Sequence, residues 1–168
     1  MQIEIRNYRP GDLHACRALW EELVERHRLI YEDPTIGGED PGLEFDDHLA
    51  RAGAEHIWVA VVDGNPVGLT GLLLAGEEAE IEPVIVTAAL RSHGVGALLV
   101  GAARARALEA GVRFLNVSPV ARNIEALAFF LREGFDIVGH VNLFQDLGGE
   151  APRTWRSGLE LHRHAVRY

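Results

Sequence analysis

The chain has 168 residues, and its 16 basic and 25 acidic side chains give a formal net charge of −9. This length suits one domain, and 48% hydrophobic with 24% charged residues exclude a disordered chain. The acidic balance argues against nucleic acid or an anionic membrane as the main partner and suits a cationic small molecule or an amine-bearing peptide. All 16 basic residues are arginine, so lysine Schiff-base chemistry is excluded.

Cys16 is the only cysteine, which excludes an internal disulfide and a multi-cysteine zinc site. It recurs at helical spacing with Leu19, Trp20 and Leu23, so we expect a buried thiol. The N-terminal residues show no basic stretch followed by an apolar run, and no segment reaches the ~18 apolar residues of a membrane span. We therefore expect a cytoplasmic protein.

Alternating apolar and polar residues predict a first strand over 2–8, and Asp12 is expected to cap a helix that runs to about Tyr31. A loop at 34–42, rich in proline, glycine and acids, precedes a short helix at 42–52. The later predicted elements are strands at 57–62, 67–74, 77–86 and 112–117, helices at 94–110 and 123–132, and a final strand pair at 135–147 and 157–166 around Gly148-Gly149. This order predicts an α/β fold in a single domain, residues 1–168, with a mixed sheet flanked by helices.

The most informative stretch runs from Val84 to Leu99, where an apolar strand, a short turn and an apolar helix follow one another. Its Arg91-x-x-Gly94-x-Gly96 pattern favours an anion, because glycines let the backbone approach a ligand and N–H groups at a helix start attract phosphate. The alternative is an ordinary tight turn. A dinucleotide-binding fingerprint needs a third glycine where Leu99 stands, and a Walker A loop needs a lysine.

Two motifs in this order resemble the GCN5-related N-acetyltransferases. Arg91-x-x-Gly94-x-Gly96-x-Leu98-Leu99 is similar to the family's acetyl-CoA motif, and Asn123-x-x-Ala126-x-x-Phe129-Phe130, with Gly134-Phe135, is similar to its second motif. The two stand about one strand and one helix apart, and the resemblance covers essentially the whole chain. It implies the family's mostly antiparallel sheet and acetyl-CoA as cosubstrate.

The resemblance also implies which residues bind acetyl-CoA. The backbone of Val84, Ile85 and Val86 would pair with the pantetheine arm. The pyrophosphate site maps onto Arg91, Ser92, His93, Gly94, Val95, Gly96 and Ala97. Asn123 would contact the cofactor near the thioester, and a compatible alternative makes it the N-cap of the following helix.

Phe130 departs from the family pattern, which often places a tyrosine there whose hydroxyl protonates the leaving thiolate. A phenylalanine cannot donate that proton. Another group or water then supplies it, the thiolate leaves unprotonated, or the protein is inactive.

Glu80 and Glu82 are two residues apart on the strand before the turn, so they share one face of the sheet. An amine must be neutral to attack a thioester, and a nearby carboxylate, directly or through water, can accept its proton. Glu80-Ile81-Glu82-Pro83 resembles the same strand of several small-molecule acetyltransferases, in which an acid faces the acceptor. Glu82 is our first choice of base and Glu80 the second. The alternative is an exposed pair on a solvated strand.

Two other groups of polar residues are weaker candidates. An acidic set in the loop and short helix either attracts a cationic amine or forms a solvated face; it comprises Glu32, Asp33, Glu39, Asp40, Glu44, Asp46 and Asp47. His162 and His164 are expected to share the face of an exposed edge strand, without a third residue to complete a metal site. No metal is expected.

These observations predict an N-acetyltransferase that transfers the acetyl group of acetyl-CoA to a primary amine of a small molecule or peptide by direct attack in a ternary complex. A non-catalytic acyl-CoA-binding or regulatory module on the same scaffold is the alternative, motivated by Phe130. A nucleotide-binding protein is a third interpretation. The family resemblance adds a homodimer, paired through the C-terminal strands, as an expectation.

Overall fold

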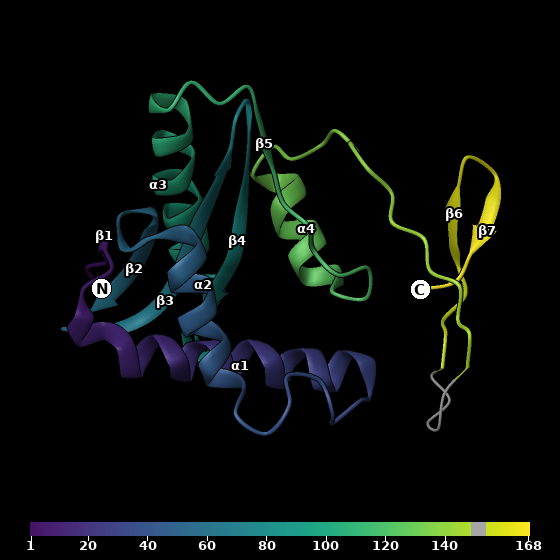
Figure 1. Cartoon of the computed structure of the whole chain (residues 1–168), viewed down its shortest axis with the longest axis horizontal. Coiled ribbons are helices and arrows are strands. Elements are labelled where there is room, and N and C mark those ends of the chain that lie inside the picture. Colours follow the sequence, from purple (N-terminus) through teal and green to yellow (C-terminus); the bar gives the residue numbers. More distant parts are fainter. Residues whose placement is uncertain (149–153) are drawn as a thin grey trace. The chain divides into compact units, whose positions relative to one another are not determined.

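A five-stranded sheet in the order β1-β2-β3-β4-β5 organises the first part of the chain (Figure 1). The structure is a computed structural model that describes residues 1–148 and 154–168. Contacts divide the chain into two compact units, residues 1–118 and 119–168. The strands of the first unit are β1 (Glu4–Asn7), β2 (Ile57–Val62), β3 (Asn65–Ala75), β4 (Glu78–Val86) and β5 (Phe114–Asn116). All neighbours pair antiparallel except β4 and β5, which are parallel.

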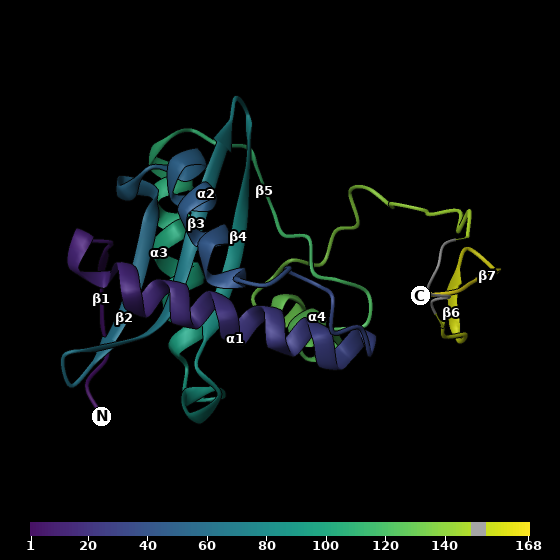
Figure 2. The same cartoon turned by 60° about the horizontal axis from the view of Figure 1, so that its bottom comes forward.

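Helices cover both faces of this sheet (Figure 2). The α-helices of the first unit are α1 (Leu13–Tyr31), α2 (Glu44–Ala52) and α3 (Val95–Glu109), joined by the 3₁₀ turns η1 (Pro10–Asp12), η2 (Pro41–Leu43), η3 (Ala54–His56) and η4 (Ala88–Leu90). Gly71 of β3 faces His48 of α2, whereas Gly68, three residues earlier, faces Leu99 of α3. Because side chains alternate along a strand, α2 and α3 lie on opposite faces. The predicted α/β fold with a mixed, mostly antiparallel sheet is confirmed.

The core between the sheet and α1 and α2 follows the predicted apolar pattern. Cys16 is completely buried, as expected, among Leu19, Trp20 and Val24 of α1 and Phe45 of α2. Burial raises the pKa of the Cys16 thiol to about 12. The thiol is therefore a packed, protonated group at neutral pH.

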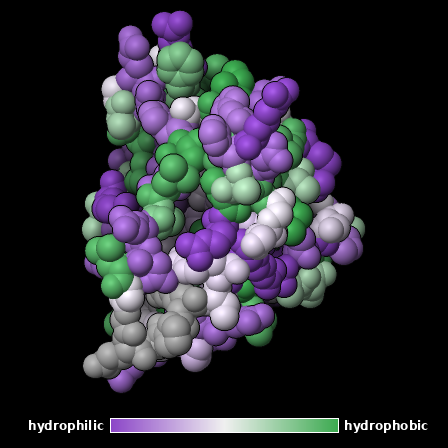
Figure 3. Space-filling view, turned by 90° about the vertical axis from the view of Figure 1, so that its right-hand side faces the viewer, coloured by the Kyte–Doolittle hydropathy of each residue, from purple (hydrophilic) through white to green (hydrophobic). Residues whose placement is uncertain are grey.

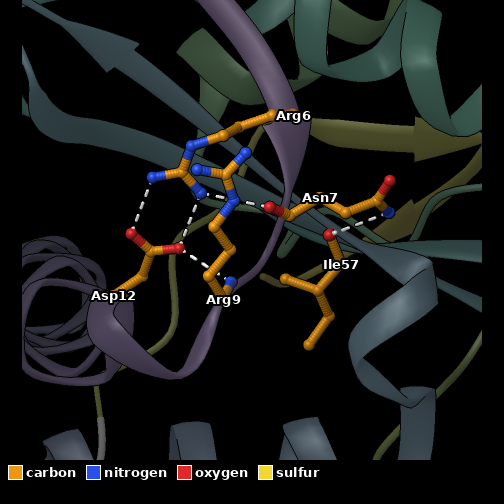
Figure 4. A network of polar contacts seen from close by, with 5 residues as sticks. All are labelled: Arg6, Asn7, Arg9, Asp12 and Ile57. Carbon is orange, nitrogen blue, oxygen red and sulfur yellow. Dashed lines mark hydrogen bonds and ion pairs between the residues drawn. The ribbon is translucent and has the colours of Figure 1, made fainter.

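Asp12 joins β1 to the start of α1 (Figure 4). It occupies the N-cap position of α1, but its carboxylate accepts two hydrogen bonds from the Arg6 guanidinium, at 2.7 and 2.8 Å, and one from the Arg9 N–H, at 2.8 Å. The expected side-chain cap is thus replaced by a bidentate ion pair, which is stronger than a neutral hydrogen bond. The Arg6 hydrogen bonds hold the pKa of Asp12 below its ordinary value.

β4 contains a bulge where it turns away from β5. Thr70 of β3 pairs with Val84, and Leu72 pairs with Ile81, so Gly71 faces both Glu82 and Pro83. The Thr70 hydroxyl donates a 2.7 Å hydrogen bond to the Pro83 carbonyl. A bulge bends and twists its strand, and pairing of β4 with β5 stops at Glu80. The bulge therefore explains why β4 and β5 splay.

The second unit contains α4 (Ile124–Arg132) and a hairpin of β6 (Leu159–Leu161) and β7 (His164–Val166). The predicted strand at 135–147 is wrong: these residues form no strand, and Ile137, Phe144 and Leu147 are highly exposed. A strand needs a partner for its backbone hydrogen bonds, and here β6 and β7 pair with each other. Hydrophobic side chains reach the molecular surface elsewhere too (Figure 3).

The hairpin falls inside the predicted single strand at 157–166. His162 and Arg163 both have positive φ, at 47° and 68°, which matches a two-residue turn that follows the twist of the strands. His162 therefore lies in the turn and His164 begins β7, so the predicted shared strand face is wrong. The prediction of a turn at Gly148-Gly149 falls partly outside the described residues. Within the described ranges, no helix combines the length and apolarity needed to cross a membrane.

Candidate active site

The splay of β4 and β5 leaves one edge of β4 free of a strand partner. Beyond Glu80, no strand among the described residues pairs with this edge, which we call the open edge (residues 81–86). The Thr87 N–H donates to Val67 of β3 at 2.9 Å. Because backbone groups alternate along a strand, those of Val84 and Val86 point to the open edge. Ile85 lies between them, so its backbone N–H and C=O point to β3 instead, and its side chain is buried in the core.

A turn continues directly from the open edge into α3. It passes through η4 and reaches Gly94, the N-cap of α3, at φ 83°. An added Cβ on Gly94 would meet no atom of this chain within 4 Å, so its outer side is open. The first turn of an α-helix carries N–H groups without intrahelical partners, here those of Val95, Gly96 and Ala97. These donors and the helix dipole suit a pyrophosphate.

The exposed side chains of the turn brace its backbone. Arg91 donates from Nε to the Val86 carbonyl at 3.1 Å, and His93 Nδ1 lies 2.8 Å from the Arg91 carbonyl. Ser92 adopts a left-handed conformation with φ 63°. The remaining guanidinium donors of Arg91 are on the solvent side of an exposed residue, where an anion has access to them. Val95 is buried, so only its backbone N–H can serve a ligand.

Glu22 of α1 holds the start of this turn, a role that sequence reasoning missed. Its carboxylate accepts from the Thr87 hydroxyl at 2.9 Å and from the Ala88 N–H at 3.2 Å. Glu22 and Thr87 are 65 positions apart in the sequence, so no local pattern predicts their contact. Glu22 fixes the direction in which the chain leaves β4.

Glu80 and Glu82 lie on the same face of the sheet, as predicted. Glu80 pairs with Leu73, which packs in the core beneath α1 and α2, and Glu82 reaches Arg51 of α2. The Arg51 Nη2 and the Glu82 Oε1 are 3.1 Å apart, and both side chains are partly exposed. Glu82 is thus the carboxylate at the bulge, where β4 leaves β5, while Glu80 is at the last pair with β5.

His48 of α2 is the second residue that sequence reasoning missed. It is 1% exposed, and its ring packs on Trp20 with centroids 5.2 Å apart. Burial lowers the pKa of His48 to about 4, although the nearby Glu82 carboxylate acts in the opposite direction. The ring is neutral at physiological pH. The only sequence signal was its place on the apolar side of a short helix.

The acidic set is mostly a solvated surface. Asp46 forms an ion pair with Arg17, whose hydrogen bond lowers the Asp46 pKa, and Glu44 accepts a 3.1 Å bond from the Trp20 indole N–H. Five members are exposed, namely Glu32, Glu39, Asp40, Glu44 and Asp47. No group of three histidine, cysteine or acidic residues in the described part of the chain is arranged to hold a metal ion.

The second motif lies in the second unit. Asn123 is the N-cap of α4, and its Oδ1 accepts from the Ala126 N–H at 3.1 Å. Phe130 is buried between Phe129 and Phe135, with ring centroids 5.1 and 5.7 Å away. The capping role of Asn123 is therefore present; its contact with the cofactor stays a prediction.

Comparisons with known proteins agree with this architecture. No curated protein sequence matches the chain. Among solved structures, an acetyltransferase of the GNAT family from Staphylococcus aureus is similar, with TM-score 0.68, 17% identity, and coverage of 90% of this chain and 96% of that one. PaiA N-acetyltransferase from Thermoplasma acidophilum, solved with coenzyme A, has TM-score 0.68 and 17% identity over 82% and 92% of the two chains.

Glucosamine-6-phosphate N-acetyltransferase from Arabidopsis thaliana has TM-score 0.64 and 15% identity over 88% of this chain and 100% of that one. At these identities the solved structures show the shared fold. The model of the acetyltransferase (GNAT) family matches residues 16–135, more than two thirds of the chain. The chain therefore belongs to the GNAT family of acetyl-CoA-dependent N-acetyltransferases.

Proposed function

We propose that this protein acetylates a primary amine of a small molecule or peptide, and that the amine attacks acetyl-CoA directly in a ternary complex. One observation carries the proposal: the open edge of β4 leads into a glycine-capped helix start, and a carboxylate, Glu82, projects from the same strand at the bulge. Backbone donors for a cofactor and a proton acceptor thus lie on one continuous segment.

The residues of the open edge and the turn fit acetyl-CoA. Acetyl-CoA supplies the acetyl group as a thioester, whose carbonyl carbon is the electrophile. Backbone groups of Val84 and Val86 would hold the pantetheine arm, and an N–H there would polarise the thioester carbonyl. The positive φ and open side of Gly94, the N–H groups that follow it, and Arg91 would hold the pyrophosphate.

Glu82 is the residue we assign as general base. At neutral pH the acceptor arrives as an ammonium ion, and its nitrogen must lose a proton before it can form the new amide bond. Glu82, directly or through one water, accepts that proton. Glu80 is the second choice, because it lies on the same face but one pleat further from the turn.

Direct attack is supported by the state of the single cysteine. Cys16 is buried and its pKa is raised to about 12, so it offers no thiolate for an acetyl-enzyme intermediate. Since Phe130 has no hydroxyl, another group or water protonates the leaving thiolate, or the thiolate leaves unprotonated.

We also propose that residues 1–168 act as one acetyltransferase domain. The family model runs from residue 16 to residue 135 and so crosses the boundary between the two compact units, which supports this view. Pairing of two subunits through the C-terminal strands stays a prediction.

The experiment is acetyl-CoA turnover with a panel of primary amines: a polyamine, an aminoglycoside, an amino-acid derivative and a peptide with a free N-terminus. We expect at least one amine to accelerate release of free thiol well above the rate in buffer, with the acetylated amine detected by mass spectrometry. Incubation with acetyl-CoA alone should leave the protein mass unchanged. CoA binding without turnover of any amine would contradict the proposal.

A further inference from the structure

His48 is enclosed, yet neither of its ring nitrogens has a hydrogen-bond partner among the described residues. A neutral imidazole carries one N–H donor and one acceptor nitrogen. Buried polar atoms in native proteins almost always have partners, and an unpaired one reduces stability. We therefore expect the ring of His48 to hydrogen-bond with a water or with a polar group close to it.

The ring lies against the bulge of β4. A Cβ built on Gly71 would stand 2.2 Å from the His48 Nε2 and 2.7 Å from the Glu82 carbonyl oxygen. Only a glycine leaves room at this point of β3, where the imidazole edge and the bulged backbone approach the same Cα. Trp20 packs on the ring and carries no titratable group. The Nε2 edge of His48 therefore lies close to the backbone of Glu82.

α2 brings a second group to the same carboxylate. His48 and Arg51 are three residues apart, which places them on one side of the helix. Arg51 is 3.1 Å from Glu82 Oε1, while no donor of the described residues reaches Oε2. Arg51 and His48 of α2 therefore both approach the β4 bulge that carries Glu82, the residue we assign as base.

We infer that His48 is a positioning residue for Glu82: its ring N–H donates, directly or through one bound water, to Glu82 Oε2 while Arg51 holds Oε1. The inference rests on the proposed role of Glu82. The charged groups that act on the pKa of the His48 ring are Glu82, which raises it, and Arg51, which lowers it. Burial lowers the pKa of His48, so the ring serves as a neutral donor and does not compete for the proton of the amine.

A carboxylate held from two sides keeps one orientation toward the acceptor nitrogen. Positioning of this kind acts on the reaction step more than on the binding of acetyl-CoA, because His48 approaches β4 from the α2 face, whereas the proposed cofactor groups are backbone atoms of Val84, Val86 and the turn at Gly94. His48 substitutions should consequently change kcat, with the KM for acetyl-CoA nearly constant.

The experiment compares His48→Leu, which removes both ring nitrogens, with His48→Gln, which keeps an amide donor of similar reach. His48→Leu should lower kcat about 10- to 100-fold, the range seen when such supporting partners are removed, and His48→Gln should recover most of it. His56→Leu is the matched control, because His56 also has a buried unpaired nitrogen, Nε2, but lies outside the site. Its kcat should equal that of the wild type.

The same substitution in a Glu82→Gln background separates the two proposals. If His48 acts through Glu82, His48→Leu should change kcat by less than about twofold in that background. A full His48→Leu effect there, or equal losses for His48→Leu and His48→Gln, overturns the inference and leaves the base assignment intact. An unchanged kcat for Glu82→Gln alone overturns the base assignment, and the inference with it.

A measurement in folded protein guards against variants that fail to fold. The ¹⁵N NMR signals of the His48 ring should move when Glu82 is replaced by glutamine, while those of His56 stay in place. Unmoved His48 signals would overturn the inference whatever the kinetics.

Discussion

The open edge of β4 and the face of the same strand that meets α2 are built in opposite ways. On the open edge and in the turn that follows, the groups that we propose to bind acetyl-CoA are backbone N–H and C=O atoms, with Gly94 at φ 83° and Arg91 as the main charged side chain. On the α2 side, the chemistry depends on side chains from two elements, Glu82, Arg51 and His48. Backbone sites fail when the chain conformation changes, and side-chain sites fail when one functional group is removed.

The difference also separates the two functions that we propose. The proposed acetyl-CoA site on the open edge and turn depends on backbone conformation. The proposed acceptor site depends on the Glu82 carboxylate at the bulge, where a small displacement would change proton transfer. Substitutions should therefore divide into those that abolish CoA binding and those that slow turnover with CoA binding retained.

The largest effect is expected for Gly94→Val. A β-branched residue is strained at φ 83°, and its side chain would occupy the open side of the turn, so CoA binding should be abolished. Isothermal titration with CoA measures this. Gly94→Asn, which tolerates positive φ, should fold well and still bind weakly. Gly101→Ala in α3, where a Cβ also meets nothing within 4 Å, is the control with normal binding. Unchanged affinity in a folded Gly94→Val protein would remove the phosphate site from the turn.

Glu82→Gln should lower kcat about 10²–10⁴-fold, the usual contribution of a general base, while the affinity for acetyl-CoA changes only a few-fold. Steady-state kinetics and the low-pH limb of the kcat/KM profile report the loss. Glu80→Gln is the matched control, one pleat along the same face. A damaging Glu80→Gln with a nearly silent Glu82→Gln would move the base by one pleat. If neither substitution changes kcat, the group that accepts the proton of the amine is water or a loop acid such as Asp33.

Arg91→Ala should weaken CoA about tenfold and weaken a pantetheine fragment without pyrophosphate much less, since the guanidinium contributes through charged hydrogen bonds. Competition binding with both ligands measures the ratio. The arginine also donates to the Val86 carbonyl. Equal losses for the two ligands would mean that this internal contact, and not the anion, is its role.

The last prediction concerns stability at acid pH. His48 has a folded pKa of about 4 against an ordinary value of 6.5, so the unfolded chain binds a proton between these values that the folded chain does not. The contribution of the neutral His48 ring to the free energy of unfolding is therefore fully present above pH 6.5. It is lost as the pH drops toward 4, and the loss is about 3 kcal/mol at most. Urea unfolding across that range should show a steeper fall for the wild type than for His48→Gln. Parallel curves would exclude a buried neutral ring.

Much of the site follows from local sequence, and the second unit shows where local patterns fail. Gly94 and Gly96 after an apolar strand predict the turn and the helix start, because positive φ and free N–H groups are properties of adjacent residues. The shared face of Glu80 and Glu82 follows from strand alternation. The apolar residues at 135–147 have the local pattern of a strand. A strand, however, needs a partner for its backbone hydrogen bonds, and β6 and β7 pair with each other.

The order of the elements as far as α4, the burial of Cys16, the glycine-capped turn and the family follow from the sequence alone, because each depends on near neighbours or on two spaced motifs. Only the tertiary structure decided the rest. Glu22 reaches the turn from α1, and His48 and Arg51 reach β4 from α2, across more than 30 residues of chain. The bulge opposite Gly71, which opens the edge and aims Glu82, depends on the register between two strands. Such contacts are chosen by packing, which a local pattern does not contain.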